Sequence, residues 1–262
     1  MDSRLANTPG FGRCGACMYR ETGPSALCYA CASRTMEGLA KWGDRCERCD
    51  HPFNLGERSC RNPVCNFAEP YFEWNFAIAM RSGTLQGAIN AYKYDGNRGW
   101  GVIFGRILAG FLAERADAFR HFDLIVASPT WMGAGGRSFD HTGEVLAHAA
   151  SDVPRGSAWP FDVNADPSIV KLSDTPRLVG HTYQERRRIA ENDLRTLLRV
   201  THPERIHRRQ VLVYDDVFTD GLTLREVARA LILAGGARTV CGVTLCRQRY
   251  RGGTGADRTS SP

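Results

Sequence analysis

The sequence predicts an α/β protein with an open, mostly parallel sheet that carries helices on both faces, preceded by a small cysteine-rich module. Short apolar runs alternate with segments of helical periodicity from residue 83 to residue 246, as they do in parallel sheets with helical crossovers. Loops rich in glycine and hydroxyl residues follow two of these runs, at the edge where such sheets bind ligands. Eight of the ten cysteines lie between residues 14 and 65. We therefore expect a zinc-binding module in residues 1–70, the α/β domain in residues 71–250 and a disordered tail in residues 251–262.

Composition and charge narrow the class of protein. The chain has 262 residues, of which 43% are hydrophobic and 24% charged, as in ordinary folded domains. No apolar run approaches the roughly 18 residues that a membrane span needs, and residues 1–12 lack the apolar core of a signal peptide. These observations favour a cytoplasmic protein that does not bind membranes. In that compartment, paired cysteines indicate a metal site rather than disulfides.

The clustered cysteines form two sets of four. Each set offers four thiolates and no open position, so it predicts a closed, structural zinc site. Iron in a rubredoxin-like site is the alternative. His51 is near enough to the second set to compete as a ligand, although a surface histidine is the simpler interpretation. The two sets are Cys14, Cys17, Cys28 and Cys31, and Cys46, Cys49, Cys60 and Cys65.

The first part of the α/β domain is expected to contain two helices and a strand. Residues 66–83 have the character of a connector with an aromatic cluster that packs against the cysteine module. Residues 83–94 have a helical pattern that ends at Gly96, and a second helix is expected over about 102–119. The apolar residues 123–127 predict a buried strand that ends at Ser128 and Pro129.

The middle of the chain is predicted to carry loops around a binding site. Residues 130–141 form a glycine-rich loop with Arg137 before a helix around residues 144–146, which is a weak indication of an anion site. Residues 151–180 hold four prolines and little periodicity, as active-site loops or mobile hoods do. A helix over residues 182–199 is expected to begin with a capping box of Thr182 and Glu185.

A local excess of positive charge follows in residues 171–210. This segment has ten Lys or Arg and five Asp or Glu, an excess of +5 out of the net +6 of the whole chain. A pyrophosphate-bearing substrate and nucleic acid would both use such a surface. A solvated, arginine-rich helix face explains it equally well.

Residues 211–233 carry the strongest functional pattern, which is a buried strand, a short loop and a helix. Asp215 and Asp216 are expected near the carboxyl end of the strand, where they can accept hydrogen bonds from a pair of sugar hydroxyls. The following loop and helix start are suited to bind a phosphate through backbone amides and hydroxyls. Residues 239–246 predict another buried strand, with Cys241 and Cys246 as small core residues. The expected phosphate-binding residues are Val217, Phe218, Thr219, Asp220, Gly221, Leu222 and Thr223.

Residues 211–223 resemble the phosphoribosyl-pyrophosphate (PRPP) motif of type I phosphoribosyltransferases. The order of features from Cys14 to Cys246 resembles the ComF family, the competence-associated phosphoribosyltransferase-like proteins. These features are the paired-cysteine sets, a helix ending in Tyr-Lys-Tyr-Asp-Gly at 92–96, Arg-Ser-Phe-Asp-His at 137–141, Glu-Arg-Arg at 185–187 with Asn192, and the PRPP motif.

The resemblance implies the type I phosphoribosyltransferase fold with magnesium-bound PRPP as the ligand, and a possible transfer of the phosphoribosyl group to a nitrogen nucleophile. It implies that Asp215 and Asp216 hold the ribose hydroxyls, that residues 217–223 bind the 5′-phosphate, and that Ser128, Pro129 and Arg137 bind the pyrophosphate. A non-catalytic accessory role in DNA uptake, with single-stranded DNA or a DNA-uptake helicase as partner, is the alternative.

Two departures from the family pattern bear on this choice. Asp220 stands where relatives have a hydroxyl or small residue, and residues 137–141 replace the usual Arg-Gly-Phe-Asn-Gln. An Asp220 carboxylate about 6 Å from a phosphate would cost about 3 kcal/mol per phosphate charge at an effective dielectric constant near 20. If the carboxylate points away from the phosphate, it costs little.

Overall fold

The computed structural model describes residues 44–249 except 54–55, 58, 82, 153–158, 177 and 179. The first cysteine set and the expected tail in residues 251–262 lie outside the described residues. Within them, the helical elements are η2 (Pro63–Asn66), α2 (Gly83–Tyr94), α3 (Gly99–Glu114), α4 (Ala116–Phe119), α5 (His141–Ala150), α6 (Tyr183–Arg188), η4 (Ile189–Leu194), α7 (Arg195–Leu197), η5 (Pro203–Arg205) and α8 (Leu222–Leu233). The strands are β1 (Asn75–Met80), β2 (Leu124–Ala127), β3 (Ile169–Lys171), β4 (Leu198–Val200), β5 (Gln210–Phe218) and β6 (Thr239–Arg247).

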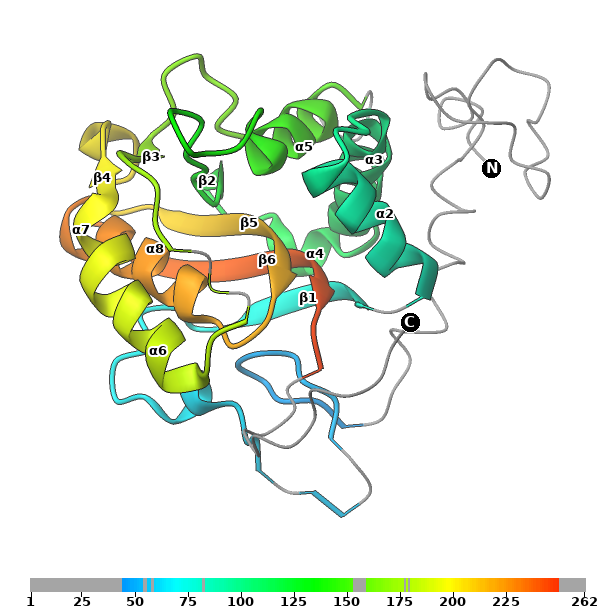
Figure 1. Ribbon diagram of the computed structural model, residues 1–262. Coiled ribbons are helices and arrows are strands. Elements are labelled where there is room, and N and C mark those ends of the chain that lie inside the picture. The colour runs from blue at the N-terminus through cyan, green and yellow to red at the C-terminus, as the bar shows by residue number, and fades with distance from the viewer. Residues whose placement is uncertain are drawn as a thin grey trace.

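A four-stranded sheet with the order β1-β6-β5-β2 forms the centre of the fold (Figure 1). Its three pairings are all parallel. β3 and β4 form a separate antiparallel pair. The central strands β5 and β6 are buried on both faces, which explains why the sequence has nearly continuous apolar runs there. The predicted α/β class with a mostly parallel sheet is confirmed.

Helices cover both faces of this sheet, as the sequence predicts. Successive side chains of a strand point to opposite faces, so β5 contributes Leu212 and Tyr214 to one apolar core and Val211 and Val213 to the other. The first core contains the buried sides of α2, α3 and α5. The second contains the buried side of α8. Figure 1 shows α2, α3 and α5 on one side of the strands and α8 on the other.

The cysteine module shares the second core instead of forming one of its own. Cys49 and Val64 are fully buried and belong to the same apolar cluster as Phe72 and Phe218. The rings of Phe72 and Phe218 meet edge to face at 6.1 Å between centroids. The described part of the module therefore packs against Phe218 at the carboxyl end of β5.

The structure corrects three element predictions. Residues 75–80 were expected to be part of a connector, but they form the edge strand β1. The prediction failed because the aromatic cluster in this stretch obscured the alternation of buried and exposed residues. The helix expected over 102–119 begins at Gly99 and is interrupted at Arg115. The helix expected over 182–199 begins with the predicted capping box but continues as a π-helical segment and ends before β4.

The helices of the described residues were also compared with the requirements of a membrane span. None of them combines the length and the apolar composition that crossing a bilayer requires.

Candidate functional site

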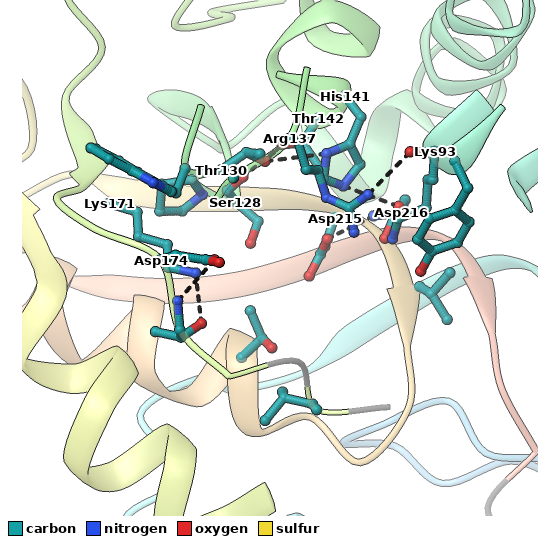
Figure 2. Close-up of a pocket in the computed structure, with 18 of the residues that line it drawn as sticks. Lys93, Ser128, Thr130, Arg137, His141, Thr142, Lys171, Asp174, Asp215 and Asp216 are labelled. Carbon is teal, nitrogen blue, oxygen red and sulfur yellow. Dashed lines mark hydrogen bonds and ion pairs between the residues drawn. The ribbon is translucent and has the colours of Figure 1, made fainter. Parts of the chain in front are cut away.

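A hollow of about 810 Å³ lies at the carboxyl ends of β2 and β5. Its wall includes the end of α2, the loop after β2, the acids of β5 and the segment after β3 (Figure 2). A smaller hollow of about 250 Å³ adjoins it, and Asp215, Thr219 and Thr223 line both. The site is therefore at the edge of the sheet where the sequence placed it.

Asp215 and Asp216 lie within β5, two residues before its end, and both line the larger hollow. Because they are consecutive residues of a strand, their side chains point in opposite directions. Asp216 is 6% exposed. Asp215 is more accessible, and one of its carboxylate oxygens accepts the backbone N–H of Asp216 at 2.9 Å. The two acids therefore occupy different environments.

Lys93 and His141 hold Asp216. The Lys93 ammonium forms an ion pair with Asp216 Oδ2, and His141 Nε2 lies 3.3 Å from the same oxygen. Burial by itself would raise the pKa of Asp216, but the Lys93 charge and His141 hold that pKa well below its usual range. Burial lowers the pKa of His141, and the Asp216 charge opposes this effect. Figure 2 shows Lys93, His141 and Asp216 gathered on one side of the hollow.

Asp215 has the opposite electrostatic character. Burial and then the neighbouring Asp216 charge raise the pKa of Asp215 to about 7. A carboxylic acid with this pKa exchanges its proton near neutral pH, whereas Asp216 stays ionised. The pair thus provides one fixed anion and one titrating group at the mouth of the hollow.

The loop after β2 is anchored to the start of α5 by a chain of hydroxyl contacts. Thr142 Oγ1 donates to the carbonyl of Ser128 at 2.7 Å, and the Thr130 hydroxyl lies 3.2 Å from that of Thr142 and 3.3 Å from His141 Nδ1. Asp140 caps α5 by accepting the N–H of Gly143 at 3.0 Å. Asp140 and His141 therefore organise the start of α5 and the surroundings of Asp216.

The three expected pyrophosphate-binding residues all line the larger hollow: Ser128, Pro129 and Arg137. Arg137 Nη1 donates to the carbonyl of Lys93 at 3.2 Å, and its guanidinium lies over the ring of Tyr94 at 5.3 Å. The partner in this contact is a neutral carbonyl, and no acidic side chain of the described residues forms an ion pair with Arg137. A cation held in this way beside a hollow can bind an anion.

Lys171 supplies a second cation on the far side of the hollow, where Figure 2 places it with Asp174. Its ammonium donates to Thr175 Oγ1 at 2.7 Å. Burial lowers the pKa of Lys171, and Asp174 opposes this effect. Lys171 comes from β3 in the region expected to form a hood, so this region does contribute to the wall.

The expected phosphate loop begins at Thr219, because β5 continues through Val217 and Phe218. The side chain of Phe218 is buried in the second core, and Val217 lines both hollows. Gly221 has a φ angle of +86°, and a Cβ at this position would lie 2.5 Å from the Phe218 ring. Glycine is therefore required here both by the backbone and by packing. Helix α8 starts at the next residue, the buried Leu222, so that its N-terminus adjoins the smaller hollow.

The carboxylate of Asp220 is oriented by partners within the protein. It is 3% exposed, its Oδ2 lies 2.7 Å from Arg186 Nε, and its Oδ1 accepts the N–H of Leu222 at 3.2 Å. Asp220 therefore occupies one amide of the helix N-terminus, and Arg186 from α6 offsets its charge. The carboxylate of Asp220 therefore does not point to open solvent, and it does not face the hollow without a partner.

The second cysteine set forms a compact cluster. The sulfurs of Cys46, Cys49, Cys60 and Cys65 all lie within 4.8 Å of one another. Two of the sulfur–sulfur distances are 3.6 and 3.7 Å, close to the roughly 3.8 Å edge of a tetrahedron with Zn–S bonds of about 2.3 Å. The residues therefore fit a metal ion such as zinc. His51 is not part of the cluster, and it is buried at 7% exposure, so the interpretation as a surface histidine was wrong.

Several residues of the site were not assigned to it from the sequence. Lys93, His141 and Lys171 come from three separate elements, and only the fold brings them together. The Tyr-Lys-Tyr-Asp-Gly helix end was a usable signal for Lys93. Nothing in the local sequence indicates that Arg186 pairs with Asp220, 34 residues later.

The chain was compared with known proteins. No protein-family model and no curated protein sequence matches it.

Proposed function

We propose that this protein is a ComF-like, phosphoribosyltransferase-type protein whose crevice binds magnesium-bound PRPP or a related ribose phosphate. The observation that carries the proposal is the combination at the end of β5, where two acids are followed by a left-handed glycine and the start of α8, all beside one hollow. Such a site offers acceptors for ribose hydroxyls and backbone donors for a phosphate within one short segment.

The charges suggest how the ligand is divided among the residues. The 5′-phosphate occupies the smaller hollow at residues 219–223, where the amides and hydroxyls of Thr219 and Thr223 are donors. The ribose hydroxyls lie at Asp215, since Lys93 and His141 already occupy Asp216. The pyrophosphate lies between the Ser128–Arg137 loop and Lys171. Magnesium enters with the pyrophosphate and offsets part of its charge.

In a catalytic protein the ligand would transfer its phosphoribosyl group to a nitrogen nucleophile. The bond between ribose C1 and the pyrophosphate oxygen breaks and its electron pair leaves with pyrophosphate, while the nitrogen lone pair forms the new bond to C1. The residues of this chain contribute by fixing the ribose and the leaving pyrophosphate in position, which is the main requirement for such a step.

A binding protein without turnover is the second candidate, and Asp220 is the observation that favours it. Its carboxylate occupies the N–H of Leu222, a donor that would otherwise be available to the phosphate. This occupation weakens the phosphate site without removing it. In this role the protein would be an accessory factor in the uptake or handling of single-stranded DNA, and the basic segment 171–210 would face the nucleic acid.

Calorimetric titration with PRPP and magnesium tests the proposal. We expect heat of binding with one site per chain, and a marked loss of affinity in Asp215→Asn. Asp117→Asn, an equal change of charge on the exposed surface of α4, is the matched control and should bind as the wild type does. The absence of binding heat at millimolar PRPP would refute the proposal. Release of pyrophosphate during incubation with candidate nitrogen nucleophiles then separates the enzyme from the binding protein.

A further inference from the structure

Arg247, the last residue of β6, is completely buried. Its Nη1 donates to the carbonyl of Phe218 at 3.1 Å and to the carbonyl of Thr219. Its Nη2 donates to Cys49 Sγ at 3.3 Å. One side chain therefore contacts both the cysteine cluster and the beginning of the phosphate loop.

Asn62 makes a parallel connection from the same module. It lies between Cys60 and Cys65, and its backbone carbonyl accepts the N–H of Cys65 at 3.0 Å. With its amide oriented to satisfy the hydrogen-bond network, its side-chain oxygen accepts from Arg247 Nη2 at 2.9 Å and its nitrogen donates to the carbonyl of Asp220 at 3.1 Å. Three consecutive carbonyls of the loop, at residues 218, 219 and 220, are thus held from the side of the cysteine module.

These contacts determine which way the loop amides face. In a planar trans peptide the C=O and the following N–H point in opposite directions. Holding the carbonyls of residues 218–220 toward the module therefore directs the N–H groups of residues 219–221 away from it. The smaller hollow lies on that other side, because residues 218–221 line it whereas Cys49, Asn62 and Val64 do not.

The charge of Arg247 indicates what the module must contain. No carboxylate of a described residue forms an ion pair with this guanidinium, and its Nε has no hydrogen-bond partner there. The nearby Asp50 carboxylate and the Phe218 ring, 4.6 Å away, offset its charge only in part, and a buried charge without a direct partner is destabilising. Four thiolates around a divalent ion carry a net charge of −2, and Arg247 touches one of these sulfurs directly. Without the ion, no bond holds the four sulfurs at the spacing observed, and the sulfur that accepts from Arg247 would lose its fixed position.

We propose that Arg247 couples the metal centre at Cys46, Cys49, Cys60 and Cys65 to the phosphate loop, so that metal occupancy fixes the loop conformation and thereby sets its affinity for a phosphorylated ligand. The affinity part of this inference rests on the proposed function. The conformational part does not. By linkage, a ligand that binds the loop must also raise the affinity of the module for its metal by the same factor.

Hydrogen–deuterium exchange on the full-length protein tests the coupling without any ligand. Zinc-loaded wild type is compared with chelator-treated wild type, Arg247→Lys and Arg247→Met. We expect exchange of a peptide covering residues 217–224 to rise at least about tenfold in all three, which corresponds to the loss of one hydrogen bond to a charged group. Arg225→Lys is the matched control, since Arg225 is also buried and near the loop but bonds to Glu69, Glu191 and Glu226. It should leave that peptide unchanged.

The outcomes separate this inference from the proposed function. A peptide covering β2 reports global unfolding; if Arg247→Met unfolds, the comparison of wild type with and without zinc decides. Equal exchange of residues 217–224 with and without zinc would overturn the coupling. In calorimetry, zinc removal and Arg247→Lys should each weaken PRPP binding, and saturating PRPP should raise zinc affinity in competition with a chromophoric chelator. A wild type that shows no heat refutes the proposed function, while the exchange data still decide on the link between Arg247, the metal and the loop.

Discussion

Replacing Asp220 by threonine is expected to strengthen the binding of PRPP, by an amount that follows from the Coulomb energy and from one hydrogen bond. An unpaired carboxylate about 6 Å from a phosphate charge would cost about 3 kcal/mol at an effective dielectric constant of 20. Arg186 Nε lies 2.7 Å from Asp220 Oδ2. Arg186 offsets most of this repulsion in the wild type, but the substitution removes only the carboxylate, so the gain from the lost charge is still about 3 kcal/mol while Arg186 keeps its place.

The amide that Asp220 occupies adds a second contribution. Its Oδ1 accepts the N–H of Leu222 at 3.2 Å, and releasing this donor to the phosphate should contribute about 1 kcal/mol. The total of about 4 kcal/mol predicts a dissociation constant lower by roughly several hundredfold for Asp220→Thr, at about 1.4 kcal/mol per tenfold. Asp220→Asn removes the charge but keeps an oxygen for Leu222, so it should gain only the charge contribution, about a hundredfold.

Calorimetric titration with magnesium and PRPP at constant ionic strength measures both gains. Asp117→Asn, on the exposed surface of α4, controls for the change in net charge and should leave the affinity unchanged. If Asp220→Thr binds no more tightly than the wild type, the reasoning is refuted. If asparagine and threonine give equal gains, the charge alone matters and the amide argument is wrong.

Four further predictions follow from the site and the module. Protein purified without added metal should carry two zinc ions per chain by elemental analysis, and Cys60→Ser one; a single zinc in the wild type, or iron, would contradict the assignment. Burial and the Asp216 charge raise the pKa of Asp215 from its ordinary 3.8 to about 7 in the folded protein. The folded state therefore keeps a proton that the unfolded state loses, and this group reduces stability progressively from about pH 4 to pH 7. The stability that Asp215→Asn gains over the wild type in urea unfolding should accordingly grow across that range and stay constant above it, and wild-type PRPP affinity should rise through pH 7. Asp216→Asn should lower the free energy of unfolding by about 3 kcal/mol because it leaves the largely buried Lys93 without its partner. A loss below about 1 kcal/mol would show that Lys93 forms an ion pair with another carboxylate. If the basic segment binds single-stranded DNA, replacing the exposed Arg188 and Arg199 with alanine should flatten the salt dependence by about one unit per lost phosphate contact. Arg120→Ala, at the exposed residue that follows α4, should not.

The elements that the sequence predicts correctly are those whose signal is local. The helix over residues 83–94 and the strands that contain residues 123–127, 211–216 and 239–246 match α2, β2, β5 and β6 closely, because apolar periodicity and glycine stops act over a few residues. β1 was missed for the opposite reason. It is an edge strand whose pairing with β6 joins residues 75–80 to residues 242–247. The aromatic residues at its start obscure it in the sequence, and of these Trp74 and Phe76 pack on Phe119 of α4.

The same distinction separates the predicted from the unpredicted parts of the site. The acids, the glycine and the hydroxyls of residues 215–223 are contiguous, so the sequence identifies them as a group. The direction of the Asp220 carboxylate depends on Arg186, and the direction of the loop amides depends on Arg247 and Asn62. These partners come from α6, β6 and the cysteine module, and no spacing rule relates them to the loop.

Asp215 and Asp216 show how far a local rule extends before tertiary contacts are needed. Alternation along a strand requires that two consecutive acids face different surroundings, so unequal pKa values could be expected from the sequence alone. Which acid stays ionised could not, because the answer depends on Lys93 at the end of α2 and His141 at the start of α5. Because Lys93 and His141 both contact Asp216, that carboxylate holds the end of α2 and the start of α5 against β5. Asp215 is left as the group that can respond to a ligand, and a proton lost from it near neutral pH creates the acceptor that ribose hydroxyls need.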